Sequence, residues 1–144
     1  MPCIWGTHNR SQLFLSIAVF PPNLQGAPTN ITAFKALIDT GAQSTCISST
    51  VAQAVGLRPL GKKTISGVSG VAAHNYYSFH IGFMQIGLAG PNNTAQGNLA
   101  ILDPPIDGVE LAISGQGFDV LLGMDVIAIG SLAVEGNGTF SFSY

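Results

Sequence analysis

The sequence has very few charged residues. Only five of its 144 residues are Lys or Arg and seven are Asp or Glu, whereas 47% are apolar. The basic residues are scattered and form no stripe, which argues against a nucleic acid or an anionic membrane as the main partner. A chain with so little surface charge commonly covers part of its surface in a subunit interface, most often that of a homodimer. We therefore expect a homodimer.

A secretory signal, a membrane span and a cysteine framework are also missing. Met1–Trp5 lacks the basic start and long apolar region of a signal segment. The apolar run Leu13–Phe20 stops at two prolines, far short of a membrane span. Cys3 and Cys46 are too few for a disulfide framework and show no metal-ligand spacing with the three histidines. We expect reduced thiols, no metal, no cofactor and a cytoplasmic location.

Glycine and proline, by contrast, are abundant. Eighteen glycines and eight prolines separate short apolar segments, which is typical of an all-β chain. The length suits a single domain, residues 1–144, in which residues 1–10 match no predicted element. Strands are predicted at residues 12–20, 31–38, 45–48, 62–66, 71–76, 77–88 (as one or two), 99–102, 118–123, 132–135 and 139–144. Short helices are predicted at residues 50–55, between an N-cap at Ser49 and Gly56, and at residues 124–129, and a loop is predicted at residues 89–97.

Two hairpins are predicted from glycine-rich turns. Residues 62–66 and 71–76 can pair around Gly67-Val68-Ser69-Gly70, whose glycines supply the positive φ angles of a tight turn. A glycine-containing tip is also mobile, as a lid must be, although such tips are common in β proteins. Residues 132–135 and 139–144 can pair across Gly136-Asn137-Gly138.

Asp39 is the acidic residue that most needs an explanation. It follows Leu37 and Ile38 at the end of a predicted buried strand, where an unpaired charge is unfavourable. Thr40 and Gly41 come next, and glycine permits a tight turn and the close approach of other groups. The structural alternative is an Asp that stabilises a turn, as most Asp-Thr-Gly triplets do. Three other acids surround a proline-rich turn and are predicted to be turn and solvent residues: Asp103, Asp107 and Glu110.

The sequence around Asp39 resembles the active-site segment of retropepsin-like aspartic proteases, especially their cellular and bacterial members. Two motifs carry the resemblance: Leu37-Ile38-Asp39-Thr40-Gly41-Ala42-Gln43-Ser44-Thr45, which runs on to Ser48, and Val120-Leu121-Leu122-Gly123-Met124-Asp125. The order and spacing match from about residue 12 to the C-terminus, with Gly67–Gly70 where the family has its flap. Two positions depart from the viral members, since Gln43 replaces a frequent acid and Met124 replaces a usual Arg.

The resemblance implies a closed β-barrel with one or two short helices, assembled as a two-fold homodimer. It implies an aspartic endopeptidase that cleaves extended polypeptides without a cofactor. Asp39 would be catalytic, with Thr40 and Gly41 supporting the turn and the dimer. The substrate-binding and flap residues would be Ala42, Gln43, Gly67, Val68, Ser69 and Gly70. Three residues would pack beneath the active turn: Leu121, Leu122 and Gly123.

Carboxylate chemistry independently requires a second acid. Peptide hydrolysis needs one ionised carboxylate to deprotonate water and one protonated carboxyl to polarise the scissile carbonyl. Two carboxylates about 3 Å apart share a single proton, and aspartic proteases are the usual example of this effect. The chain has one Asp-Thr-Gly triplet, so the second Asp39 must come from a second copy.

Two other interpretations remain. A non-catalytic dimer of the same fold could bind peptides or direct assembly, but such a module has no need of an intact Asp-Thr-Gly-Ala turn. An ordinary β-sandwich with Asp39 as a turn residue would be monomeric and would bind no transition-state mimic. The intact turn favours the endopeptidase.

Overall fold

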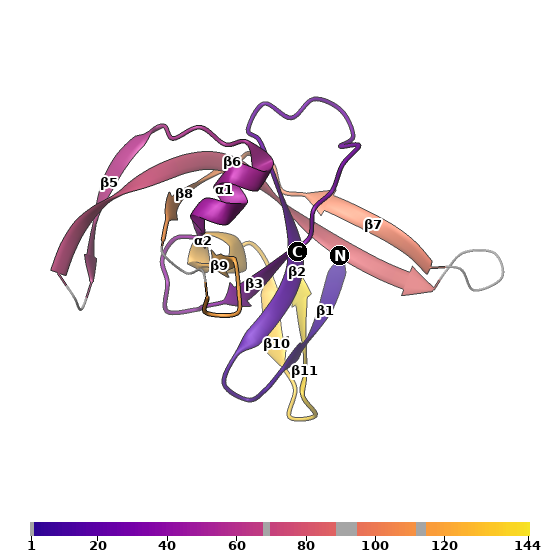
Figure 1. Cartoon of the computed structure of the whole chain (residues 1–144). Coiled ribbons are helices and arrows are strands. Elements are labelled where there is room, and N and C mark those ends of the chain that lie inside the picture. The colour runs from indigo at the N-terminus through magenta and orange to yellow at the C-terminus, as the bar shows by residue number, and fades with distance from the viewer. Residues whose placement is uncertain (1, 68–69, 89–94, 112–114) are drawn as a thin grey trace.

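Strands dominate the fold, together with two short helices (Figure 1). The structure is a computed structural model that describes residues 2–67, 70–88, 95–111 and 115–144. The helices are α1 (Ser49–Val55) and α2 (Met124–Ile127). The strands are β1 (Cys3–His8), β2 (Leu13–Phe20), β3 (Phe34–Ile38), β4 (Cys46–Ile47), β5 (Gly61–Gly67), β6 (Gly70–Leu88), β7 (Ala95–Ile101), β8 (Ile106–Glu110), β9 (Val120–Leu122), β10 (Ser131–Val134) and β11 (Thr139–Ser143). None of the helices that the described residues form is long and apolar enough to cross a membrane.

The described strands form one hydrogen-bonded sheet. Its order is β10-β11-β1-β2-β3-β9-β4-β8-β6-β5, and β7 pairs with β6. β2 also pairs with β6, so the path of pairings from β2 through β3, β9, β4, β8 and β6 returns to β2. β9 lies between β3 and β4, parallel to the former and antiparallel to the latter. The two motifs that the sequence singled out are therefore neighbours in space.

β6 is the longest strand, with 19 residues. Its first half pairs with β5 and its second half with β7. The two resulting hairpins extend from opposite sides of the molecule, with α1 and α2 between them (Figure 1). The predicted pairing of residues 62–66 with 71–76 is confirmed and reaches Gly67 opposite Gly70. Val68 and Ser69 lie outside the described residues.

The core follows from the alternation of side chains along the strands. On β2, Leu15, Ile17 and Val19 are buried, as expected for one face of a strand with a two-residue period. Phe142 of β11 packs edge-on against Phe83 of β6, with ring centroids 5.5 Å apart. Aromatic packing thus joins the C-terminal strand to the long central strand.

Several predicted elements are confirmed. The strand predicted at residues 12–20 is β2, and it pairs with β3 as a hairpin. The hairpin predicted across Gly136-Asn137-Gly138 is β10–β11. The first helix ends at Gly56, whose φ of 76° is the left-handed conformation that glycine adopts without strain.

Other predictions were wrong in detail. No element was predicted for residues 1–10, but Cys3–His8 form β1 between β11 and β2. Ala95–Gly97 belong to β7 rather than to a loop. The N-cap of α1 is Ser48, whose side chain accepts a hydrogen bond from the N–H of Val51, and Ser49 is already helical. Propensity alone rarely fixes a boundary to the residue, because tertiary pairing decides where a strand stops.

The strand β8 was missed altogether. Asp107 and Glu110 were predicted to be turn residues, but both lie on β8, which pairs with β4 and β6. The Glu110 carboxylate accepts a hydrogen bond from the Tyr77 hydroxyl across that pairing. Asp103, in contrast, lies exposed in a bend, as predicted. The short Asp- and Gly-containing segment of β8 has low intrinsic β propensity, so its neighbours determine its conformation.

Candidate active site

Asp39 lies just past the end of β3, and backbone groups hold its turn. Its N–H donates to the carbonyl of Leu122 at 2.9 Å, and its carbonyl accepts from the N–H of Ala42 at 3.2 Å. The N–H of Gly41 donates to Asp39 Oδ1 at 2.9 Å. The other carboxylate oxygen, Oδ2, accepts no hydrogen bond from the residues that the structure describes. One oxygen is thus fixed, and the other is available to a ligand.

Gly41 supplies space for the carboxylate of Asp39. A Cβ atom added at this position would lie 3.2 Å from Asp39 Oδ1, which is closer than ordinary van der Waals contact. Its φ angle is outside the left-handed region, so close approach is the property of glycine that matters here. The neighbouring Thr40 is exposed, and its hydroxyl forms no hydrogen bond with any described residue of its own chain.

Helix α2 holds the continuation of the turn. The N–H of Met124 donates to the carbonyl of Ala42 at 2.8 Å, and the N–H of Asp125 donates to the carbonyl of Gln43 at 3.2 Å. A Cβ atom added at Gly123 would lie 2.6 to 2.9 Å from the backbone C, O and N atoms of Ser44. Only glycine therefore allows the start of α2 to lie directly against the turn.

Asp125 and Thr45 form the second tie between α2 and the turn. Thr45 is fully buried, and its hydroxyl donates to Asp125 Oδ1 at 2.7 Å while its N–H donates to Oδ2 at 3.0 Å. The Thr45 hydroxyl also accepts from the N–H of Gly123 at 3.1 Å. Hydrogen bonds to an ionised carboxylate are stronger than neutral ones, so this cluster fixes the turn firmly. Sequence reasoning gave Asp125 no role of its own, although an acid in the first turn of a helix is a capping signal.

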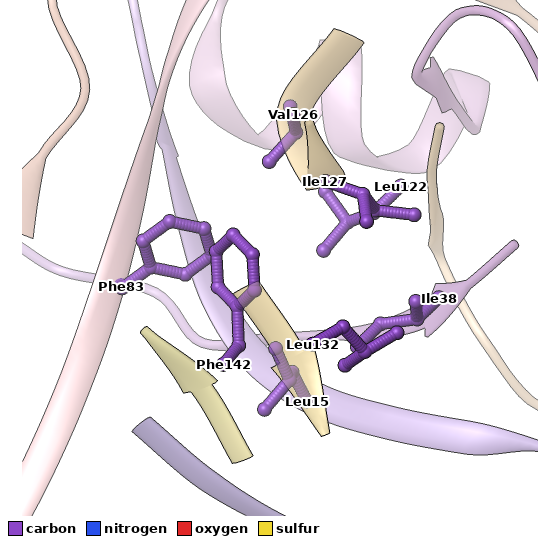
Figure 2. Close-up of a pocket in the computed structure, with 8 residues that line it drawn as sticks. All are labelled: Leu15, Ile38, Phe83, Leu122, Val126, Ile127, Leu132 and Phe142. Atoms are coloured by element: carbon purple, nitrogen blue, oxygen red, sulfur yellow. The ribbon is translucent and has the colours of Figure 1, made fainter. Parts of the chain in front are cut away.

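A small apolar cavity lies behind the turn (Figure 2). Ile38 and Leu122, which precede Asp39 and Gly123 in the chain, contribute to its wall. Its lining consists of Leu15, Ile38, Phe83, Leu122, Val126, Ile127, Leu132 and Phe142. Its volume of about 10 Å³ is far below the roughly 300–1,000 Å³ of a typical ligand site. The cavity therefore belongs to the core that supports the turn.

A larger groove opens beside the turn, with about 1060 Å³ of empty space, part of it open to solvent. Residues of the turn, of β4, of β5 and of the β8 region line it: Ala42, Gln43, Ser44, Cys46, Lys63, Thr64, Ile65, Ser66, Val109 and Leu111. Ala42 and Gln43 were predicted to bind substrate, whereas the contributions of β5 and β8 were missed. The register between β4 and β8, which sets this wall, is invisible in the sequence.

The remaining predicted site residues lie at the facing ends of β5 and β6 or next to the Asp39 turn. Gly67 ends β5 and Gly70 begins β6 with a φ of 119°. Leu121 pairs with Leu37 on one side and with Cys46 on the other, and Leu122 is buried beneath the turn. The structure therefore brings Leu121, Leu122 and Gly123 to the Asp39 turn.

Cys46 is one of the residues that line the groove, and only 7% of its surface is exposed. Burial raises the pKa of its thiol to about 11, and the negative charges of Asp125 and Asp39 act in the same direction. The neutral thiol therefore predominates near neutral pH, and the residue is a poor nucleophile.

We predict that Cys46 reacts slowly with iodoacetamide. Because its thiol pKa is raised, the thiolate fraction and the alkylation rate should increase about tenfold per pH unit between pH 7 and 9. Mass spectrometry of the Cys46 peptide measures the rate, and the Cys46→Ser protein identifies any labelling of Cys3. Complete modification within minutes at pH 7 would contradict a buried, protonated thiol.

Comparisons with known proteins agree with this geometry. The family model described as aspartyl protease matches residues 24–126. Solved structures that are similar include a retropepsin-like aspartic protease from Rickettsia conorii, with a TM-score of 0.57 and 16% identity, over 99% of this chain and 91% of that chain. No curated protein sequence matches the chain. The structural likeness, at this identity, shows a shared fold.

The family match covers both segments that build the turn. It includes Asp39 with its Thr-Gly-Ala continuation, and it extends through β9 to the first residues of α2. These are the segments that the hydrogen bonds of Asp39, Thr45 and Asp125 join. Sequence and fold therefore agree that the chain belongs to the aspartyl protease family and is retropepsin-like.

Proposed function

We propose that this chain is an aspartic endopeptidase that acts as a two-fold homodimer, with one Asp39 from each subunit at the catalytic centre. The observation that carries the proposal is the Asp39 turn, which lies beside a groove. It presents a carboxylate with one oxygen bonded to the N–H of Gly41 and the other bonded to no residue that the structure describes. Carboxylates held rigidly in this way are suited to general acid–base catalysis.

The need for a second copy follows from the chain's own residues. The sequence contains a single Asp-Thr-Gly triplet, and within the described part of the chain no second acid bonds to Asp39. The exposed Thr40 hydroxyl is available for a hydrogen bond to the other subunit. The returning path of strand pairings supports a closed barrel, as does the fold likeness.

Exposed apolar side chains on α2 and on the segment that follows it support an interface on this part of the surface. Met124 begins α2, Ile129 follows it, and Val134 lies on β10, and they are 39%, 50% and 55% exposed. β10 is also the last strand at one end of the sheet path. An unpaired edge that carries exposed apolar residues is a suitable surface for a second copy.

The reaction follows general acid–base chemistry. One Asp39, ionised, takes a proton from the bound water, whose oxygen attacks the scissile carbonyl carbon. The second Asp39, protonated, donates to the carbonyl oxygen and stabilises the tetrahedral intermediate. Collapse of the intermediate breaks the C–N bond, and the leaving amine takes a proton from a carboxyl group. The products are a new carboxyl terminus and a new amine.

The substrate would bind as an extended segment along the groove. Main-chain hydrogen bonds would position it like an added strand, while the groove walls would accept its side chains. Ala42 and Gln43 would contribute from the turn. The β5–β6 hairpin, with Gly67, Val68, Ser69 and Gly70 at its tip, would act as the flap.

Mixing wild-type and Asp39→Asn chains at constant total concentration tests the proposal. If each site needs two Asp39 residues and the dimers exchange at random, activity on an unfolded protein falls as the square of the wild-type fraction, to about a quarter in an equal mixture. A linear fall would mean that each chain acts alone.

Because a carboxyl pair that shares one proton titrates as a unit, the rate should peak on the acid side of neutral. A rate that still rises above about pH 8 would contradict the shared proton.

A further inference from the structure

Both faces of β5 contribute to the groove, whose wall also includes residues of β4 and of the β8 region. Residues that pair across neighbouring strands share a face of the sheet, and alternate residues along a strand return to it. Lys63 pairs with His74, and Ile65, two residues further along β5, lies on the same face. Val109 pairs with Cys46, and both line the groove together with Lys63 and Ile65. This face of β5 therefore brings an apolar side chain and one ammonium group to the groove, and Thr64 and Ser66 add hydroxyl groups from the other face.

Lys63 is the charged residue among the described residues that line the groove. It forms no ion pair within the described part of the chain. Its Nζ lies 4.4 Å from the centroid of the Tyr76 ring, which attracts the cation without neutralising it. A cation held near an aromatic face at the rim of a groove can still bind an anion.

The hairpin that carries Lys63 contains other basic residues and no acidic ones. Residues 61–77, which comprise β5 and the part of β6 that pairs with it, contain two lysines, one histidine and no acid. The cross-strand neighbour of Lys63 is the imidazole of His74. Asp39 is not among the residues that line the groove, and in the proposed mechanism its carboxylate binds the attacking water. No carboxylate of the hairpin competes for Lys63.

We infer that Lys63 is a specificity-determining residue, which selects substrates with an Asp or Glu side chain. This inference rests on the proposed endopeptidase function and names its substrate class. An extended substrate directs every second side chain to the same side, so an acidic residue over Lys63 lies two positions from an apolar residue over Ile65. The preferred segment therefore pairs an apolar with an acidic residue, separated by one residue. A charge-assisted hydrogen bond from the ammonium to the carboxylate supplies the selection.

Lys62 provides the matched control. It carries the same charge one residue earlier on β5, where it pairs with Asn75, and it is not among the residues that line the groove, although Thr64 and Ser66 on its face are. A preference that depends on a direct contact will be lost when Lys63 is replaced and kept when Lys62 is replaced. A preference that arises from the general charge of the hairpin will be weakened by replacing either lysine.

The experiment has two stages. Wild-type protein first digests an unfolded protein mixture, and mass spectrometry identifies the position at which acidic residues are enriched around the cleaved bonds. Two peptides that differ only by Glu or Gln at that position are then compared for wild type, Lys63→Gln, Lys63→Glu and Lys62→Gln. We expect wild type and Lys62→Gln to favour the Glu peptide about tenfold in kcat/KM. Lys63→Gln should reduce the ratio to about one, and Lys63→Glu should invert it.

The outcomes distinguish this inference from the proposed function. Two results would overturn the role of Lys63 and leave the proposed protease function intact. One is Asp39-dependent cleavage without enrichment of acidic residues. The other is an equal loss of the preference for the Glu peptide in Lys62→Gln and Lys63→Gln. Binding of the same two peptides to the Asp39→Asn protein gives a readout that needs no turnover. Equal affinity for both peptides in that protein would also overturn the inference, whereas absence of any Asp39-dependent cleavage would overturn the proposed function.

Discussion

Replacing Asp39 by Asn should abolish hydrolysis of an unfolded protein substrate while the protein remains folded. Asn occupies nearly the same volume and keeps an oxygen that can accept the Gly41 N–H, so the turn retains the hydrogen bond now made at 2.9 Å. The amide can neither take a proton from water nor give one to the substrate. Since the substitution removes both carboxylates of the proposed dimer, we expect at least about a thousandfold loss of kcat.

The measurement compares wild type, Asp39→Asn and Asp107→Asn. Asp107 is an exposed acid on β8 that does not line the groove, so the same change there should leave the rate nearly unaltered. Circular dichroism and molar mass in solution establish that fold and assembly are unchanged. Undiminished turnover by purified Asp39→Asn would remove Asp39 from the reaction and with it the proposed mechanism.

Replacing Gly123 by Ala should cause the largest loss of stability among single substitutions near the turn. The added methyl would lie within 2.6 to 2.9 Å of backbone atoms of Ser44, which cannot move as the end of a side chain can. Relieving the clash means separating α2 from the turn, and this weakens the hydrogen bonds from Gly123 and Met124. We expect a decrease of about 3 kcal/mol or more in the free energy of unfolding.

Gly136→Ala is the matched control for this prediction. Gly136 lies in the β10–β11 turn, its added Cβ would meet nothing within 4 Å, and its φ angle is outside the left-handed region. Its substitution should change stability by no more than about 0.5 kcal/mol. Chemical denaturation of both variants measures the difference. Equal stabilities would mean that Gly123 is not tightly packed against Ser44.

The position of the catalytic candidate could be predicted from the sequence. An acid after Leu37-Ile38 and before Thr-Gly marks a strand that ends in a tight turn, because local propensity, burial and turn chemistry agree there. The same local agreement located the hairpins at Gly67–Gly70 and Gly136–Gly138. Strong local signals of this kind depend on residues close together in the chain.

The groove could not be predicted in this way. Its wall depends on β8, whose short sequence Ile106-Asp107-Gly108-Val109-Glu110 carries no clear strand pattern. β8 is a strand because β4 and β6 provide hydrogen-bonding partners on both sides. The role proposed for Lys63 likewise rests on the groove, because Lys62 is the same residue type with the same charge and only Lys63 lines the groove.

By itself, the sequence determined a glycine-rich, mostly β chain with one Asp-Thr-Gly turn and a later apolar-apolar-Gly segment. The tertiary structure alone decided that these two segments meet, through the parallel pairing of β3 with β9 and the hydrogen bonds that Thr45 donates to the Asp125 carboxylate. Contacts between distant segments depend on sheet order and register. Those features arise from the packing of the whole core, whereas a turn is stabilised by its own few residues.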